Sequence, residues 1–470
     1  MINAKIMRAA RWVPLTGSLM GSMIWAIASA GAQPCPPGFQ SGEPGESGIF
    51  DSFSAYVQPM AEYQGKLIFG GAFSAAGPIS TNCVAAFDPV SGQWSALGGG
   101  VYLGFTNGYA AALATFSLNG VPSLIMGGGF NSVRNGNGSL VPNTTGLAAW
   151  NGSQWASLAT STNNTARSVW TLMDWQPSPG VHRLLVGGGG QIGDSTANGI
   201  AYFDGELWSN IGGPGATGID GTFSPTVFCS AIYNGNLYIG GRFASVNRVT
   251  AANIARWNGS VWQRPGVLGN GGAASDVSSL HVFDDGTGAK LYAGGYDIRP
   301  GGLEATVAAF NGTTWSRTGQ NLGGRGTSLA AYDDGTGMKL YMGMTADATQ
   351  RYVYRLESNV WTPIDGGVAE PITPNFPSVF GLFVARGSLF VGGNFQTAGG
   401  RAAYGIARYA ACSRPACPAD ITGDGFLDAF DYDAFVEAFE TGGPRADFNN
   451  DGFADAFDYD DYVTAFEAGC

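Results

Sequence analysis

Two twelve-residue stretches near the C-terminus carry oxygen-bearing side chains at regular spacing. Residues 420–431 read DITGDGFLDAFD, and residues 447–458, which lie 27 positions later, read DFNNDGFADAFD. Oxygen side chains stand at positions 1, 3, 5, 9 and 12 of both stretches, and glycine stands at position 6. A hard cation such as Ca²⁺ takes six to eight oxygen ligands, and a glycine allows the chain to wrap around it. The sequence therefore predicts two Ca²⁺ sites.

The spacing matches the calcium loop of an EF-hand, in which the backbone carbonyl at position 7 joins the side-chain ligands. Aspartate replaces the usual glutamate at the last position of both loops. The ligands predicted for the first site are Asp420, Thr422, Asp424, the Phe426 carbonyl, Asp428 and Asp431. Those predicted for the second are Asp447, Asn449, Asp451, the Phe453 carbonyl, Asp455 and Asp458.

A helix is expected directly after each loop, over residues 431–440 and 458–467. Apolar side chains recur there at i, i+3, i+4 and i+7, which is the pattern of one buried helix face. The residues on these two faces are Tyr432, Phe435, Val436 and Phe439, and Tyr459, Tyr462, Val463 and Phe466.

Two loop-then-helix copies in tandem resemble a dockerin, the module that attaches secreted proteins to cohesin-bearing scaffolds. The flanking Cys417-Pro418 and the final Gly469-Cys470 are similar to the Gly-Cys-ended dockerins of planctomycete-like bacteria. The resemblance implies a small α-helical, calcium-binding domain over residues 419–470, with a cohesin-like protein or another surface scaffold as its partner. Positions 10 and 11 carry Ala-Phe in both loops, where cohesin-binding dockerins commonly carry hydroxyl residues. The sequence leaves the choice of scaffold open.

The rest of the chain is built from a repeated phrase of the type LYxGGxF. Its first glycines lie 49 to 60 residues apart. Self-similarity at such a period, with strand-like units, predicts a β-propeller, because one small sheet cannot bury both of its faces alone. The seven copies are LIFGGAF (67–73), LIMGGGF (124–130), LLVGGGG (184–190), LYIGGRF (237–243), LYAGGYD (291–297), LYMGMTA (340–346) and LFVGGNF (389–395).

Each copy is predicted to belong to a four-stranded unit. A small apolar inner strand precedes the phrase, and a third strand that ends in Asn-Gly or Asp-Gly follows it, which favours a type I′ hairpin into an outer strand. The expected fold is therefore all-β, a seven-bladed propeller of four-stranded blades over residues 33–411, with the small helical domain behind it. A tryptophan marks the outer strand of six of the seven units and is expected to pack between blades: Trp94, Trp155, Trp208, Trp262, Trp315 and Trp361.

These repeats resemble the kelch-like and cortical cell-polarity-marker propellers, whose units also combine LYxGGxF with a tryptophan strand. The resemblance implies the fold alone, since propellers support binding, scaffolding and catalysis alike.

Two features of the sequence bear on how the ring is closed, namely the outer strand of the seventh unit and the cysteines at its two ends. The seventh unit ends at Ala411 without an outer strand, so this strand is either missing or supplied by residues 36–48. Residues 412–418 are the expected linker. Six cysteines allow 15 connectivities; by position, Cys35–Cys412 would fasten the ring and Cys417–Cys470 would clip the tail, while Cys83 and Cys229 are expected to be buried thiols.

Residues 1–32 have the pattern of an export signal. Lys5, Arg8 and Arg11 precede an apolar run, and small residues then offer cleavage after Ala30 or Ala32. The run is interrupted and short for a membrane anchor. We therefore expect a secreted or cell-surface protein.

Charge is concentrated in the C-terminal part of the chain. The formal net charge is −12, and residues 417–470 contain 14 acids and one base, so they carry −13 and the remainder +1. No basic patch is present in the sequence, which argues against a nucleic-acid partner.

Catalytic motifs are scarce in the repeats. A copper-radical oxidase needs two histidines, but the two in this chain, His182 and His281, lie in different repeats and are expected to be structural. The carboxylate pairs Asp284-Asp285 and Asp333-Asp334 lie in DDGTG segments that are typical of hairpin turns. The sequence therefore favours a non-catalytic binding or display protein, with an unknown protein or carbohydrate ligand on a loop-bearing face that includes residues 131–146. The alternative is an extracellular carbohydrate-active hydrolase or lyase, which would need two convergent carboxylates in the central depression.

Overall fold

The structure of the 470-residue chain is a computed structural model. It divides into two compact units, one of residues 37–413 and one that includes residues 414–470. The predicted export signal, the linker at 412–418 and the four cysteines Cys35, Cys412, Cys417 and Cys470 lie outside the described residues. Those described are 37–40, 44–45, 47–51, 55–103, 106–158, 168–222, 224–269, 275–345, 351–369, 377–411, 419, 421, 429–441, 443, 446–448 and 454–468.

The larger unit is all-β, and each sequence repeat forms four antiparallel strands, here numbered as repeats 1 to 7. Repeat 1 has β3 (Tyr56–Tyr63), β4 (Lys66–Ala72), β7 (Val84–Asp88) and β8 (Gln93–Ala96). Repeat 2 has β11 (Tyr109–Leu118), β12 (Val121–Gly129), β15 (Leu147–Trp150) and β16 (Trp155–Ala156). Repeat 3 has β17 (Ser168–Ser178), β18 (Val181–Gln191), β19 (Asn198–Phe203) and β20 (Trp208–Ser209). Repeat 4 has β22 (Thr226–Tyr233), β23 (Asn236–Arg242), β26 (Ile254–Trp257) and β27 (Trp262–Gln263).

The remaining repeats follow the same order. Repeat 5 has β28 (Asp276–Asp284), β29 (Ala289–Ile298), β30 (Ala305–Phe310) and β31 (Trp315–Arg317), with a 3-10 turn, η2 (Pro300–Gly302), between β29 and β30. Repeat 6 has β32 (Arg325–Asp333), β33 (Met338–Thr345), β34 (Val353–Glu357) and β35 (Val360–Pro363). Repeat 7 has β37 (Ser378–Ala385), β38 (Ser388–Asn394), β41 (Ile406–Ala410) and, from the N-terminus, β1 (Gly38–Gln40).

Four small sheets accompany these repeats. Three of them have three strands: β2 (Ile49–Phe50) with β5 (Ala75–Ala76) and β6 (Ile79–Ser80); β21 (Ile219–Asp220) with β24 (Ser245–Val246) and β25 (Val249–Thr250); and β36 (Val368–Ala369) with β39 (Thr397–Ala398) and β40 (Arg401–Ala402). The fourth contains β9 (Gly100–Leu103), β10 (Thr106–Asn107), β13 (Ser132–Arg134) and β14 (Leu140–Val141).

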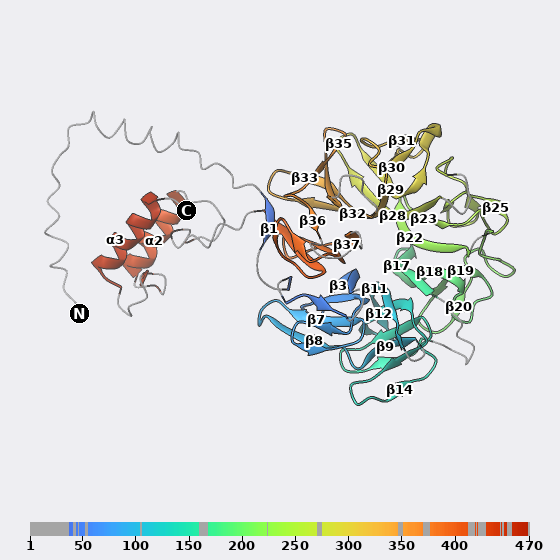
Figure 1. Cartoon of the computed structure of the whole chain (residues 1–470), viewed down its shortest axis with the longest axis horizontal. Coiled ribbons are helices and arrows are strands. Elements are labelled where there is room, and N and C mark those ends of the chain that lie inside the picture. Colours follow the sequence, from blue (N-terminus) through green and yellow to red (C-terminus); the bar gives the residue numbers. More distant parts are fainter. Residues whose placement is uncertain are drawn as a thin grey trace. The chain divides into compact units, whose positions relative to one another are not determined.

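The first strands of the repeats lie around a common centre (Figure 1). Each contacts the first strand of the next repeat, from β3 through β11, β17, β22, β28 and β32 to β37, and β37 contacts β3. We call these seven strands the inner strands.

The glycine pairs of the repeated phrase allow neighbouring repeats to approach closely. A Cβ on Gly240 would lie 2.5 Å from Cγ1 of Val277 in the next repeat, and a Cβ on Gly241 would lie 2.1 Å from the carbonyl oxygen of Thr226 in its own inner strand. Both positions therefore need glycine for lack of space. The first glycine makes the same contact with the next inner strand at Gly70–Ala110, Gly127–Val169, Gly187–Val227, Gly343–Val379 and Gly392–Val57.

The N-terminal strand β1 completes repeat 7. It pairs antiparallel with β41, with Phe39 opposite Tyr409. The Phe39 ring packs edge-on against Tyr409 at 5.5 Å, and the Phe39 N–H donates to the Asp365 carboxylate at 2.7 Å. Residues within 36–48 thus supply the outer strand, which covers a sheet edge that would otherwise be open.

The outer tryptophans pack between neighbouring repeats, as predicted. Trp155 Nε1 donates to the carbonyl of Leu97 in the preceding repeat at 2.7 Å. The corresponding bonds are Trp208 to Leu158, Trp262 to Ile211, Trp315 to Pro265 and Trp361 to Thr318, while Trp94 donates to Ser47 Oγ.

The hairpins at Asn-Gly and Asp-Gly form, but the type I′ assignment is wrong. In the loop from Asn258 to Val261, only Gly259 has a positive φ, of 95°. The Asn258 carboxamide oxygen accepts the N–H groups of Ser260 and Val261 at 3.0 and 2.9 Å, which gives a four-residue loop closed by an Asx turn.

In the smaller unit, the described elements are two helices of equal length, α2 (Ala429–Thr441) and α3 (Ala456–Ala468), which confirm the two predicted helices. The helices pack through equivalent residues: Phe435 stacks on Tyr462 at 3.9 Å, and the Tyr432 and Tyr459 hydroxyls are hydrogen bonded. The cross-contacts are reciprocal, since Phe435–Tyr459 and Tyr432–Tyr462 both measure 6.3 Å. The two sequence copies therefore pack with an approximate two-fold relation.

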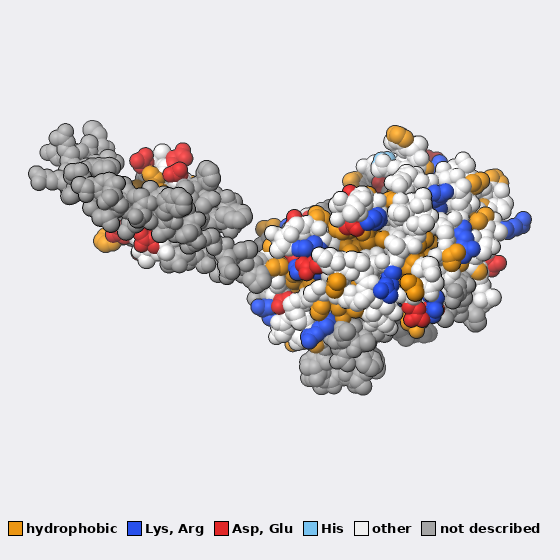
Figure 2. Space-filling view, turned by 90° about the horizontal axis from the view of Figure 1, so that it is seen from above, with side chains coloured by type: hydrophobic (Ala, Val, Ile, Leu, Met, Phe, Trp, Pro, Cys, Tyr) orange, Lys and Arg blue, Asp and Glu red, His pale blue; other side chains and the backbone are white. Residues whose placement is uncertain are grey.

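No helix in the described part of the chain has the length and apolar character needed to cross a membrane. Figure 2 shows one side of the larger unit, where basic and acidic side chains are interspersed among polar and apolar ones.

Candidate functional site

Every inner strand is interrupted near its start by a β-bulge at the same place. In repeats 3 to 7 the register shifts between Val169 and Thr171, Val227 and Cys229, Val277 and Ser279, Gly326 and Ser328, and Val379 and Gly381. Repeats 1 and 2 shift between Val57 and Met60 and between Ala110 and Ala112. A bulge leaves one residue without a ladder partner and changes the direction of its side chain.

The bulged residues meet in one pocket of about 570 Å³. Trp170, Phe228, Ser278, Thr327 and Phe380 come from repeats 3 to 7, and Gln58 comes from repeat 1. Residues from the starts of the inner strands and the ends of the second strands complete the lining. We call this the central pocket.

Aromatic rings form one part of the central pocket. Trp170 contacts Tyr109 and Phe228, each at 5.7 Å between ring centroids, and Tyr56 contacts Phe380 at 5.2 Å. Burial, with smaller effects from Tyr109 and Cys83, raises the pKa of Tyr56 to about 12. Tyr56 therefore presents a neutral hydroxyl, which can donate and accept a hydrogen bond.

Two arginines form another part of the pocket, and both pair with one buried carboxylate. Asp276 has a side chain that is 2% exposed, and its Oδ2 lies 2.9 Å from Arg325 Nη2 and 3.5 Å from Arg242 Nη2. The Arg242 guanidinium also lies over the Phe228 ring at 5.7 Å. Nε of Arg242 is buried and has no hydrogen-bond partner among the described residues.

Hydroxyl groups fill much of the remaining lining, and several of them already donate to the protein. Ser278 Oγ donates to Asp276 Oδ1 at 2.7 Å, and Thr226 Oγ1 donates to the Ser224 carbonyl at 2.9 Å. Ser168 Oγ accepts from Trp170 Nε1 at 3.1 Å. Hydroxyls whose proton is used in this way keep acceptor capacity toward a ligand.

The described lining of the central pocket contains no Asp or Glu. The neighbouring Asp276 is held by two arginines, so the two convergent carboxylates that hydrolysis would require are not found among these residues.

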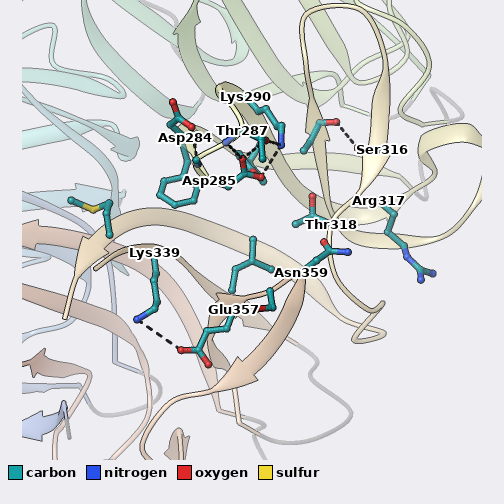
Figure 3. A pocket seen from close by; sticks show the side chains of 17 residues that line it. Asp284, Asp285, Thr287, Lys290, Ser316, Arg317, Thr318, Lys339, Glu357 and Asn359 are labelled. Carbon is teal, nitrogen blue, oxygen red and sulfur yellow. Dashed lines mark hydrogen bonds and ion pairs between the residues drawn. The ribbon is translucent and has the colours of Figure 1, made fainter. Parts of the chain in front are cut away.

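A second pocket, of about 800 Å³, lies between repeats 5 and 6 near the opposite ends of their inner strands (Figure 3). It contains Asp284 and Asp285, whose carboxylates cap a hairpin turn: Asp284 accepts from the N–H groups of Gly286 and Gly288. Asp285 pairs with Lys290 at 2.7 Å. Burial would raise the pKa of Asp285, but hydrogen bonds from Lys290 and Thr287 outweigh it and hold that pKa at about 2. The interpretation of these acids as turn residues is confirmed.

The predicted calcium ligands are described in part. Asp431 and Asp458, at position 12 of the two loops, are fully buried at the starts of α2 and α3. Asp458 Oδ2 accepts the Asp455 N–H at 2.8 Å. A buried carboxylate needs polar or cationic partners, so these positions fit the acidic end of a calcium loop.

The other described ligands are Asp447 and Asp455, whereas Asp420, Thr422, Asp424, Phe426, Asp428, Asn449, Asp451 and Phe453 lie outside the described residues. Within the described ranges no group of three or more His, Cys, Asp or Glu side chains could hold a metal ion.

Residues 131–146, which were expected to contribute to a binding surface, form β13 and β14, and the described lining of the central pocket takes no residue from them. The residues that do line it were not predicted from the sequence. A usable signal is the large aromatic residue directly after valine near the start of a small-residue strand, as in Val169-Trp170, Val227-Phe228 and Val379-Phe380.

Both histidines have structural positions. His182 lies in β18, where its Nδ1 contacts Asp174 at 2.8 Å, and His281 lies in the inner strand β28. Cys83 and Cys229 are buried free thiols, as predicted.

No protein-family model matches the chain, and no curated protein sequence matches it significantly. Among solved structures, the extracellular domain of a hybrid two-component system from B. thetaiotaomicron is 12% identical with a TM-score of 0.48, and the match covers 83% of this chain and 42% of that one. An ancestral GH74 enzyme is 12% identical with a TM-score of 0.43, covering 81% and 51%. The computationally designed Ika8 protein is 13% identical with a TM-score of 0.39, covering 78% and 100%.

The chain spans about two fifths of the length of the first two solved structures that it matches, both extracellular domains from B. thetaiotaomicron. Identities of 11 to 13% and TM-scores below 0.5 assign neither a family nor an activity to this chain.

Proposed function

We propose that residues 33–411 form a closed seven-bladed β-propeller of the kelch-like or cortical-marker type. Support comes from the four-stranded repeats, from the successive contacts of the inner strands including β37 with β3, and from β1, which completes repeat 7. The contact between Gly392 and Val57 links repeat 7 to repeat 1 in the same way as the other repeats are linked.

The propeller binds a protein or carbohydrate ligand without catalysis, and the central pocket is the binding site. The observation that carries this proposal is the convergence of bulged side chains from six repeats on one pocket lined by aromatic, hydroxyl and guanidinium groups. Such a lining, with a few placed polar groups among apolar ones, is typical of ligand sites. The described lining offers no carboxylate pair, which favours binding over the alternative of a carbohydrate-active hydrolase or lyase.

The C-terminal domain, residues 419–470, is the attachment module. It is a dockerin-like domain of the Gly-Cys-ended type that holds two Ca²⁺ ions and binds a cohesin-like or other surface scaffold, on a bacterial protein that is exported to the cell surface or the medium. Its two-fold related aromatic core and its two buried position-12 aspartates support this proposal. Phe457, at position 11 of the second loop, is 70% exposed and offers an apolar contact to a partner.

Binding at the central pocket is tested with the full chain on a printed panel of acidic and neutral oligosaccharides, alongside an assay for released reducing ends. We expect binding without release, loss of binding in Trp170→Ala, and retention in Trp170→Phe, because phenylalanine keeps an aromatic face. Leu207→Ala, at an exposed hairpin tip, is the control. Release of reducing ends by the wild type would contradict the non-catalytic role.

Calcium binding is tested by titration calorimetry on the full chain. Two sites are expected, and Asp431→Asn or Asp458→Asn should each remove one of them. The matched controls are Asp433→Asn and Asp460→Asn, which change exposed helix carboxylates two residues further along. A chain that binds no Ca²⁺, or whose stoichiometry is unchanged by the loop variants, would refute the attachment module as a calcium domain.

A further inference from the structure

The central pocket has two chemically different sides. The aromatic rings that line it come from repeats 7, 1, 3 and 4, as Phe380, Tyr56, Trp170 and Phe228. The arginines Arg242 and Arg325 come from repeats 4 and 6, and they flank the Asp276 carboxylate of repeat 5. We propose, on the basis of the binding function above, that the central pocket recognises an acidic saccharide, with its carboxylate on the arginines and its ring against the aromatic side.

The charge balance of the arginine side favours an anion. Two guanidinium groups share one carboxylate, so this side carries one positive charge in excess. Each guanidinium has five N–H donors, and Asp276 accepts from one nitrogen of each. The side chains of Arg242 and Arg325 are 31% and 36% exposed, and both line the pocket. A ligand carboxylate would accept from their remaining N–H groups through charge-assisted hydrogen bonds, which are about twice as strong as neutral ones.

The aromatic side favours a ring with an apolar face. Trp170 and Phe228 stand nearly perpendicular to each other, at 87°, so together they form a corner rather than a flat wall. The apolar C–H face of a pyranose can pack against such rings, which bury a large area at a small entropic cost.

The hydroxyl groups of the pocket lining favour a saccharide over an acidic peptide as the ligand. The lining side chains Ser168, Ser278, Thr226 and Thr327 all take part in hydrogen bonds within the protein and keep lone pairs free. These acceptors suit a ligand rich in hydroxyl donors. A volume of about 570 Å³ lies within the range of small-ligand sites of roughly 300 to 1,000 Å³. The combination favours a short acidic oligosaccharide over an extended peptide.

The test compares the tightest acidic member of the oligosaccharide panel with its methyl ester, which keeps every hydroxyl and removes the charge. Calorimetry on the full chain should give at least tenfold weaker binding of the ester. Arg242→Gln should weaken the acid at least tenfold and the ester less than twofold. This variant leaves Asp276 paired with Arg325 at 2.9 Å, so the buried carboxylate keeps a partner. Arg264→Gln, at an exposed position outside the pocket, is the control.

The possible results separate this inference from the broader function. Equal binding of acid and ester, or binding of neutral saccharides alone, would overturn the acidic saccharide while a carbohydrate-binding pocket stands. Binding of a glutamate-rich hexapeptide in preference to every saccharide would overturn the saccharide and leave a protein-binding pocket. If no panel member and no peptide binds the wild type more tightly than Trp170→Ala, both this inference and the proposed binding function fail.

Discussion

The chain contains one buried and one exposed carboxylate in the same sequence context. Comparing them tests how much burial changes the contribution of an ion pair to stability. Asp285 and Asp334 occupy equivalent positions in the segments DDGTGAKLY and DDGTGMKLY. Asp334 has a fully buried side chain, whereas that of Asp285 is 32% exposed. Each accepts from a tyrosine hydroxyl, Tyr341 at 2.7 Å and Tyr292 at 3.2 Å.

The difference in burial between Asp334 and Asp285 arises from the third strand of each repeat. Arg355 in β34 lies opposite Tyr341 and pairs with the Asp334 carboxylate, while the equivalent position opposite Tyr292 is Ala309. Asp334→Asn would leave a largely buried guanidinium with Glu357 as its remaining ion-pair partner. Removing one partner of a buried pair costs about 3–5 kcal/mol, whereas an exposed pair such as Asp285–Lys290 contributes about 0–1 kcal/mol.

The pH dependence of this site follows from the same contacts. Burial would raise the pKa of Asp334, but hydrogen bonds from Thr336, Tyr341 and Arg355 outweigh it and lower the pKa from 3.8 to about 2. Because the folded-state pKa is depressed, the stabilisation is complete above pH 4 and is lost as the pH falls toward 2. The stability gap between the wild type and Asp334→Asn should therefore shrink across this window.

Urea unfolding followed by tryptophan fluorescence is the assay, because residues 414–470 contain no tryptophan and the signal excludes the C-terminal unit. At pH 7 the midpoint should fall strongly for Asp334→Asn and little for Asp285→Asn, with unchanged slopes. Equal losses for the two variants, or a loss below about 1 kcal/mol for Asp334→Asn, would refute the reasoning from burial and from Arg355.

Three further outcomes are expected. Gly326→Val alone should destabilise the larger unit, because its side chain would meet the sulfur of Met342, and Met342→Ala should restore part of the loss, with a coupling of about 1–3 kcal/mol in urea unfolding; additive effects would contradict this. Tyr56→Phe should reduce the loss of stability between pH 10 and 12, since the raised pKa of Tyr56 makes its ionisation favour the unfolded state; identical alkaline profiles would speak against it. Phe435→Ala should cost about 3–5 kcal/mol of the smaller unit's stability by removing the stack on Tyr462, and limited proteolysis of the C-terminal unit in the full chain would reveal this; unchanged protection would oppose the two-fold core.

The repeated phrase predicted the strands well because the same residues that identify it are required by packing. Gly240 and Gly241 are glycines because Val277 and the Thr226 carbonyl occupy the space of their side chains. Trp262 is repeated because its indole fills the gap to the preceding repeat and donates to Ile211. Where a local pattern and an inter-repeat contact depend on the same residue, the sequence reveals the architecture.

Closure by β1 could not be assigned from the sequence with the same certainty. Residues 36–47 read PPGFQSGEPGES, which has few strand formers, and the strand has three residues. Its pairing is decided by partners more than 300 positions away, namely β41 and Asp365. Such long-range contacts leave no period in the local sequence. The turn type at Asn258 was missed for a related reason, since Asn-Gly fits both a type I′ turn and an Asx-closed loop.

Variation between repeats of one chain indicates which positions would set the specificity of the proposed binding site. The residue before each bulge is Val57, Ala110, Val169, Val227, Val277 or Val379 in six repeats, and it packs against glycine of the preceding repeat. In repeat 6 the residue before the bulge is Gly326, and the sulfur of Met342 on the second strand would lie 3.3 Å from a Cβ at this position. The bulged positions themselves vary freely, as Gln58, Ala111, Trp170, Phe228, Ser278, Thr327 and Phe380.

This contrast has a structural cause. A residue in the bulge has no partner in its ladder and in six of the seven repeats lines the central pocket, so packing restricts its type less than that of the residue before it. In the proposed binding site, ligand recognition can therefore change at these positions while the glycines and valines around them keep the contacts between repeats. Packing between repeats and variation in the pocket thus depend on adjacent residues of each inner strand. A repetitive scaffold can therefore hold a pocket whose sides differ as much as Trp170 and Arg325.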